Sequence, residues 1–129
     1  MSGRLLLDTN IIIALFAQDE SVQERLAHAS ETFVPAIVLG ELYYGARKSA
    51  NAAANLAKID KLAARTAVLA CDADTAREYG RVKDQLRAKG RPVPENDIWI
   101  AAIALQHRLT LVSRDAHFAE IEGLSVERW

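Results

Sequence analysis

Four acidic residues of this chain occur in contexts that a solvent-exposed surface does not readily explain. Asp8 and Asp115 each follow a short apolar run typical of a buried strand, and Glu41 and Asp97 lie in apolar segments with helical spacing. Ligands of parallel α/β sheets bind at the carboxyl ends of the strands, so we expect Asp8 and Asp115 at that edge. If the two helical acids flank it, four carboxylates share one small volume.

Such a cluster predicts a metal site. Neighbouring carboxylates disfavour one another's ionised forms, so without a counter-charge the cluster would be destabilising. Oxygen ligands suit Mg²⁺ or Mn²⁺, which bind through a few carboxylates and keep several waters. A cation held in this way can activate a water and neutralise charge on a phosphate during displacement.

Simpler interpretations exist for three of these acids. Asp8 could cap the helix that follows it, although Thr9 is also a candidate cap. Asn96 could cap the next acidic helix, with Asp97 in its first turn meeting the helix dipole. Asp115 could be a turn residue before a short helix.

Glu41 has a simpler interpretation too, because most helical glutamates face solvent. The adjacent Gly40 argues against it, since a glycine inside a helix costs about 1 kcal/mol relative to alanine. We therefore expect another part of the structure to approach the backbone closely at Gly40.

The bulk composition is that of one soluble globular domain. The 129 residues predict a single domain over 1–129, and 16 basic against 17 acidic side chains give a net charge of −1. Nucleic-acid binding by backbone electrostatics alone is thereby disfavoured. Cys71 is the only cysteine, which excludes a disulfide framework and fits a cytoplasmic location. We expect neither a membrane span nor a signal peptide.

Strand-like and helix-like segments alternate along the chain, which predicts a parallel sheet between two helical layers. The expected strands are 5–7, 32–34, 68–71, 109–113 and 124–128. The expected helices begin after Asp8 and then cover 21–29, 36–48, 51–65, 73–89 (capped by Asp72 or Asp74 and ended by Gly90), 98–107 and 116–120.

Four motifs, LLLDTNIIIAL, VLGELYYGARKS, ENDIWIAAIAL and TLVSRDAHF, carry the four acids in this order. In order and spacing they resemble the PIN-domain ribonucleases, and most closely the VapC-type toxins of bacterial toxin–antitoxin pairs. The resemblance extends from near Arg4 to Trp129. It implies a PIN-like three-layer α/β/α sandwich with a central, mostly parallel sheet of about five strands.

The resemblance also implies roles for individual residues. The four acids Asp8, Glu41, Asp97 and Asp115 would form a site for Mg²⁺ or Mn²⁺ that hydrolyses RNA. Asp8 and Asp97 would be the principal ligands, Glu41 would assist a ligand or orient water, and Asp115 would complete the shell. Three supporting or substrate-contacting residues are expected, namely Thr9, Ser113 and Arg114.

The implied partners are an RNA substrate, a second copy in a homodimer, and a small VapB-like antitoxin. The C-terminal segment of that antitoxin would lie over the pocket, where an arginine could pair with the acids.

The remaining conspicuous residues have ordinary interpretations. Trp99 is expected in the core, and at least one of Tyr43 and Tyr44 is expected to be packed. The three histidines, His28, His107 and His117, show no metal-ligand spacing. Basic residues are expected to be surface charges, those nearest the pocket holding RNA phosphates.

Other functions remain open. A haloacid-dehalogenase-type phosphatase would need a second Asp at Asn10, and a receiver domain would need acids beside Asp8 and a lysine at Arg114. A PIN-type nuclease of RNA processing or DNA repair, acting without an antitoxin, is the nearest alternative.

Overall fold

The computed structural model describes residues 3–129. Met1 and Ser2, the first two residues of the predicted 1–129 domain, lie outside the described residues. The strands are β1 Arg4–Leu7, β2 Glu31–Pro35, β3 Ala67–Leu69, β4 Thr110–Val112 and β5 Val126–Glu127. The helices are α1 Thr9–Phe16, α2 Glu20–Ala27, α3 Ala36–Arg47, α4 Ala52–Arg65, α5 Ala73–Lys89 and α6 Glu95–His107, with a 3₁₀ helix, η1, at Ala116–Glu120.

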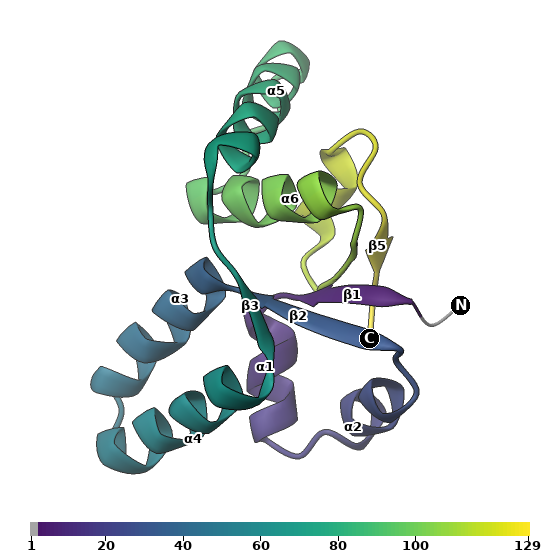
Figure 1. Cartoon of the computed structure of the whole chain (residues 1–129). Helices are drawn as coiled ribbons and strands as arrows, with labels where there is room; N and C mark the ends of the chain where they lie inside the picture. Colours follow the sequence, from purple (N-terminus) through teal and green to yellow (C-terminus); the bar gives the residue numbers. More distant parts are fainter. Residues whose placement is uncertain (1–2) are drawn as a thin grey trace.

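The sheet is five-stranded, and every described strand pair is parallel, in the order β3-β2-β1-β4-β5. This arrangement confirms the predicted α/β class and sheet. In Figure 1, α6 lies on one side of the sheet and α1 and α2 lie on the other. Helix α5 packs on α6, and α3 packs on α4.

The central strand and the central helix are the most deeply buried parts. Leu5, Leu6 and Leu7 of β1 are each at most 2% exposed, as expected for a strand covered on both faces. Six residues of α6 are buried, including Ile98 and Ile103, so this helix is apolar nearly all round. Because Asp8 directly follows β1 and Asp97 lies in the first turn of α6, the core fixes the backbone at two of the four acids.

Two predicted helix caps are wrong. The N-cap of α1 is Asp8, whose side chain accepts from the Thr9 amide, so Thr9 is the first helical residue and not the cap. Helix α6 begins at Glu95 after Pro94, which makes no side-chain cap, and Asn96 therefore lies inside the helix. With Asn96 as the cap, the first helical residue would have been Asp97. The helix begins two residues earlier, at Glu95, and Asp97 still lies in its first turn.

Two smaller expectations also need correction. Strand β3 ends at Leu69, because its pairing with β2 covers only Ala67–Leu69 before the chain turns toward the Asp72 cap of α5. Trp99 was expected in the core but is only partly buried. Its ring stacks on Tyr79, with ring centroids 4.0 Å apart. Tyr44 is 65% exposed, whereas Tyr43 is partly buried and donates to Asp60.

The expected close approach at Gly40 is absent from the described part of the chain. A Cβ added there would meet nothing within 4 Å, and Gly40 is exposed. Gly90 differs, because it ends α5 with a φ of +65°, a conformation that disfavours any Cβ. Among residues 3–129, no helix is long and apolar enough to cross a membrane.

Replacing these two glycines by alanine should change stability in opposite directions. Gly40→Ala should raise the free energy of unfolding by about 0.5–1 kcal/mol, because alanine favours the helix and has room. Gly90→Ala should lower it by about 1 kcal/mol, because the left-handed backbone penalises a Cβ. Urea unfolding of both variants measures the difference, and a destabilised Gly40→Ala would show that Gly40 has a neighbour after all.

Candidate active site

The four predicted acids line one open cleft of about 660 Å³ at the carboxyl edge of the sheet. Asp8 follows β1 and Asp115 lies three residues after β4. Glu41 comes from the middle of α3, and Asp97 comes from the first turn of α6. The structure therefore brings together side chains that are up to 107 residues apart in the chain, in the arrangement that the sequence pattern predicted.

Asp8 is the most buried member of this cluster, with 3% of its surface exposed. Its carboxylate accepts from the Thr9 amide at 2.8 Å and from the Ser113 hydroxyl at 2.7 Å. Burial nevertheless raises the pKa of Asp8 above its ordinary value, and the nearby Asp97 and Asp115 raise it further. The site therefore disfavours the charge on Asp8.

Asn10 connects two of the acids, a role that the sequence analysis missed. Its amide nitrogen lies 3.3 Å from Asp115 Oδ2 and 3.4 Å from Ser113 Oγ, and its Oδ1 accepts from the Arg114 amide at 3.2 Å. The sequence signal was available, because Asn10 lies two residues after Asp8 at a strand–helix junction. In the sequence, Asn10 argued only against a phosphatase, which would need an aspartate at this position.

The hydroxyls of Thr9 and Ser113 hydrogen bond to acids of the cleft, as expected of supporting residues. Thr9 Oγ1 donates to Glu41 Oε1 at 2.7 Å, which fixes α3 against the start of α1. Ser113 Oγ donates to Asp8 and also accepts from the Asp115 amide at 3.0 Å. Each hydroxyl thus orients a carboxylate without adding charge.

Arg114 has contacts that differ from those expected of a substrate residue. Its guanidinium pairs with Asp19 at 3.0 Å and donates to the backbone carbonyl of Trp129 at 2.8 Å. Arg114 is absent from the residues that line the cleft. Its side chain therefore anchors the C-terminal residue beside α2, and no cation of this chain reaches the acids from that position.

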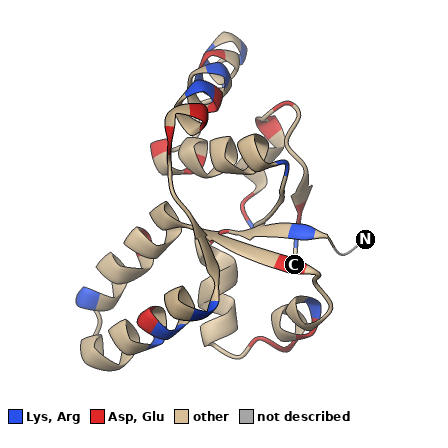
Figure 2. Cartoon of the chain, in the orientation of Figure 1, with Lys and Arg blue, Asp and Glu red and all other residues tan. Residues whose placement is uncertain are grey.

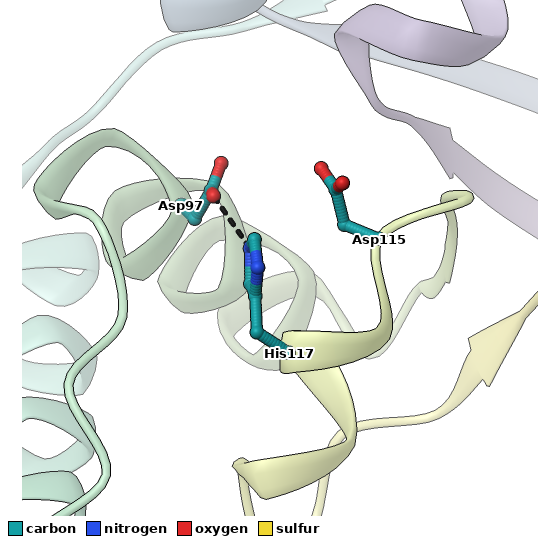
Figure 3. A group of neighbouring side chains, drawn as sticks. All are labelled: Asp97, Asp115 and His117. Atoms are coloured by element: carbon teal, nitrogen blue, oxygen red, sulfur yellow. Dashed lines mark hydrogen bonds and ion pairs between the residues drawn. The ribbon is translucent and has the colours of Figure 1, made fainter.

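Asp97 is contacted by His117, which the sequence analysis had set aside as one of three scattered histidines. His117 Nε2 lies 2.6 Å from Asp97 Oδ2, and one ligand atom each of Asp97, Asp115 and His117 fall within 4.8 Å of one another (Figure 3). Burial raises the pKa of Asp97, and Asp115 and Glu41 add to this effect, while His117 opposes it. The spacing Asp115-Ala116-His117 was the signal that could have revealed this contact.

A fifth acid, Glu95, also lines the cleft and was not predicted. Tyr79 and Lys83 both donate to its carboxylate, and these hydrogen bonds lower the pKa of Glu95. Lys83 belongs to α5, along which basic and acidic residues alternate without forming a basic face (Figure 2). Glu95 is therefore an outer-rim acid with its own counter-charge, unlike the four inner acids.

The donor set suits a hard divalent cation. The inner acids supply carboxylate oxygens, and within residues 3–129 no Lys or Arg forms an ion pair with any of them. Burial is the main cause of the raised pKa of Asp8 and Asp97, and neighbouring acids of the cleft add to it. Oxygen ligands at an open, hydrated cleft are the environment that Mg²⁺ or Mn²⁺ prefers.

Comparison with known proteins places this arrangement in a family. A family model for the PIN domain matches residues 5–124. A relative from Shigella flexneri, the tRNA(fMet)-specific endonuclease VapC, is 35% identical, with 98% of each chain covered. The chain therefore belongs to the PIN-domain family, and within it to the VapC branch.

Two solved structures support the same placement. DNA-bound VapBC from Salmonella typhimurium contains a chain that is 33% identical and superposes with a TM-score of 0.91, over 100% of this chain and 99% of that one. VapBC-5 from Mycobacterium tuberculosis, a member of the VapBC family of toxin–antitoxin systems, is 32% identical with a TM-score of 0.76, over 97% and 96%.

Replacing Asp8 by asparagine should stabilise the protein when no divalent cation is present. A raised pKa in the folded state means that the folded protein binds more protons than the unfolded one, so Asp8 costs stability as pH rises through that pKa. At pH 7 in EDTA we expect Asp8→Asn to melt higher, each 1 kcal/mol corresponding to roughly 3–6 °C for a domain of this size. The gain should vanish near pH 4.

Asp84→Asn is the matched control, because it removes an exposed acid of α5 remote from the cleft lining. Its melting temperature should stay within about 2 °C of the wild type, as is usual for a surface substitution. Thermal melts from pH 4 to pH 8 give both curves. A lower melting temperature for Asp8→Asn at pH 7 in EDTA would contradict the cost of burying the Asp8 charge among other acids.

Proposed function

We propose that this protein is the toxin of a toxin–antitoxin pair and acts as an endoribonuclease that depends on a divalent cation. The observation that carries the proposal is the convergence of Asp8, Glu41, Asp97 and Asp115 on one open cleft. The VapC endonuclease of Shigella flexneri, similar over nearly the whole chain, supports the reaction class.

The proposed cation is Mg²⁺ or Mn²⁺. Asp8 and Asp97 would hold it as the principal ligands, with Glu41 and Asp115 completing the oxygen donor set. When bound, the cation supplies a Lewis acid that stabilises negative charge on a phosphate and lowers the pKa of a bound water.

The protein's own residues would then orient the reacting groups. Ser113 and the Thr9 amide hold Asp8 in one orientation, so its oxygens are positioned before substrate arrives. The Thr9 hydroxyl occupies Glu41 Oε1, so Oε2 would remain to complete the donor set or to orient a water beside the cation.

The proposed substrate is RNA presented as an accessible single-stranded segment. The cleft is open, and the net charge of −1 leaves little general attraction for a polyanion, so recognition would depend on local contacts at the rim. The relative from Shigella flexneri cleaves tRNA(fMet), which makes transfer RNA the first substrate to test. Such a toxin would act in the cytoplasm.

The proposed protein partner is an antitoxin. A mainly apolar groove of about 340 Å³ adjoins the acidic cleft, with which it shares Thr9, Ile13 and Glu41. Ile13 is 56% exposed at this junction. An extended antitoxin segment in the groove could bring an arginine to the acids and supply the missing positive charge. A homodimer remains a prediction from the family resemblance.

Purified protein should cleave a transfer RNA pool when Mg²⁺ or Mn²⁺ is present and should stop in EDTA. Asp8→Asn should reduce the rate at least about 100-fold, because it removes a carboxylate ligand. Asp84→Asn should retain the wild-type rate. Electrophoresis of end-labelled RNA measures both, and equal cleavage by wild type and Asp8→Asn would refute the assignment.

A further inference from the structure

His117 is placed by η1 so that its imidazole reaches Asp97 from beside the cleft. Its ring packs against Phe118, with centroids 4.9 Å apart, and Phe118 is fully buried. From this anchored position Nε2 lies 2.6 Å from Asp97 Oδ2. Asp97 Oδ1 has no hydrogen-bond partner among residues 3–129.

We propose that His117 is a positioning residue, which holds Asp97 by donating from Nε2 to Oδ2 and so leaves Oδ1 directed to the divalent cation. This inference rests on the proposed function, because it concerns the same cation site. The imidazole fixes the carboxylate orientation before the cation binds, and the affinity for the cation therefore depends on the Nε2 donor.

Several contacts favour positioning over direct ligation. The residues that line the cleft include Asp97 and Asp115, but they do not include His117. The ring nitrogen nearest the acids is already in contact with Asp97 Oδ2, and Figure 3 shows the imidazole meeting Asp97 while the Asp115 carboxylate stands apart from the ring. The side chains of His117 and Asp97 are 32% and 15% exposed, so the contact is partly shielded from water.

Each of the two acids next to His117 has its carboxylate held by one neighbouring side chain. Asp115, the N-cap of η1, makes no side-chain cap, and Asn10 holds its carboxylate from the other side. Among residues 3–129, His117 is the one side chain that hydrogen bonds to the Asp97 carboxylate. Carboxylate ligands held by a second residue in this way typically lose 10–100-fold in metal affinity when that residue is removed, as an order of magnitude.

Two substitutions at His117 separate a hydrogen-bond donor from a bulky side chain. Glutamine places an amide nitrogen at nearly the reach of Nε2, so His117→Gln retains a donor to Asp97. His117→Leu fills similar space against Phe118 but offers no donor. Melting temperatures in EDTA establish that both variants are folded before any metal is added.

Calorimetric titration of the full chain with MnCl₂, and separately with MgCl₂, is the test. Wild type should bind Mn²⁺, His117→Gln should bind within about threefold of wild type, as for a near-neutral change, and His117→Leu should bind about 10–100-fold more weakly. Pulsed EPR of the Mn²⁺ complex should show no directly bonded nitrogen in wild type.

The outcomes separate this inference from the function on which it rests. If wild type binds neither cation, the metal-dependent function fails and this inference fails with it. If wild type binds but His117→Leu binds equally well, only the positioning role is overturned. A nitrogen coupling in wild type that disappears in both variants, with equal losses of affinity, would make His117 a ligand and would also overturn it.

Discussion

The placement of four carboxylates, two of them substantially buried, at one edge of the sheet is the constraint around which this structure is arranged. Asp8, Glu41, Asp97 and Asp115 share a cleft, and burial with like charge raises the pKa of Asp8 and Asp97. The nearest basic side chain on the following segment, Arg114, is turned away to Asp19 and Trp129. The chain stabilises its acids with hydrogen-bond donors instead, which orient the oxygens without neutralising them. A divalent cation fits such a site because the charge balance is still open.

The same constraint explains why the acids lie on the most rigid parts of the fold. Asp8 follows β1, whose three leucines are buried, and Asp97 lies in the first turn of α6, whose buried residues surround the helix. Apolar burial there offsets the unfavourable electrostatics of the cleft, at roughly 25 cal/mol per Å² of apolar surface. A functional site that is locally unfavourable but supported by a packed core is a general pattern in enzymes. The chain from Salmonella typhimurium superposes over the full length of this chain with a TM-score of 0.91, so the two share the fold that carries this core.

The supporting residues show where reasoning from sequence stopped short. Asn10, Glu95 and His117 contact or flank the acids, yet the sequence pattern assigned none of them to the site. Their roles depend on approach between segments: Asn10 meets Asp115 across 105 positions, and His117 meets Asp97 across 20. The N-cap of α1 was ambiguous for a related reason, since Asp8 and Thr9 are both acceptable caps. In the structure Asp8 is the cap, and the Thr9 hydroxyl donates to Glu41 instead. The expectation at Gly40 was wrong in a different way. A glycine inside a helix indicated a close neighbour, which the described chain does not provide.

The amino-acid sequence alone determined the α/β class, the alternation of strands and helices, and the four acids, because each depends on local periodicity and on residue type at strand and helix ends. The end of α5 at Gly90 and a cap at either Asp72 or Asp74 were also predictable, since both depend on neighbouring residues only, and the structure shows that the cap is Asp72. Tertiary structure decided which polar groups meet at the cleft, where Arg114 points, and how Asp97 is held. Those outcomes depend on the packing of elements distant in the chain, whose relative placement is set by the whole core and not by any short motif.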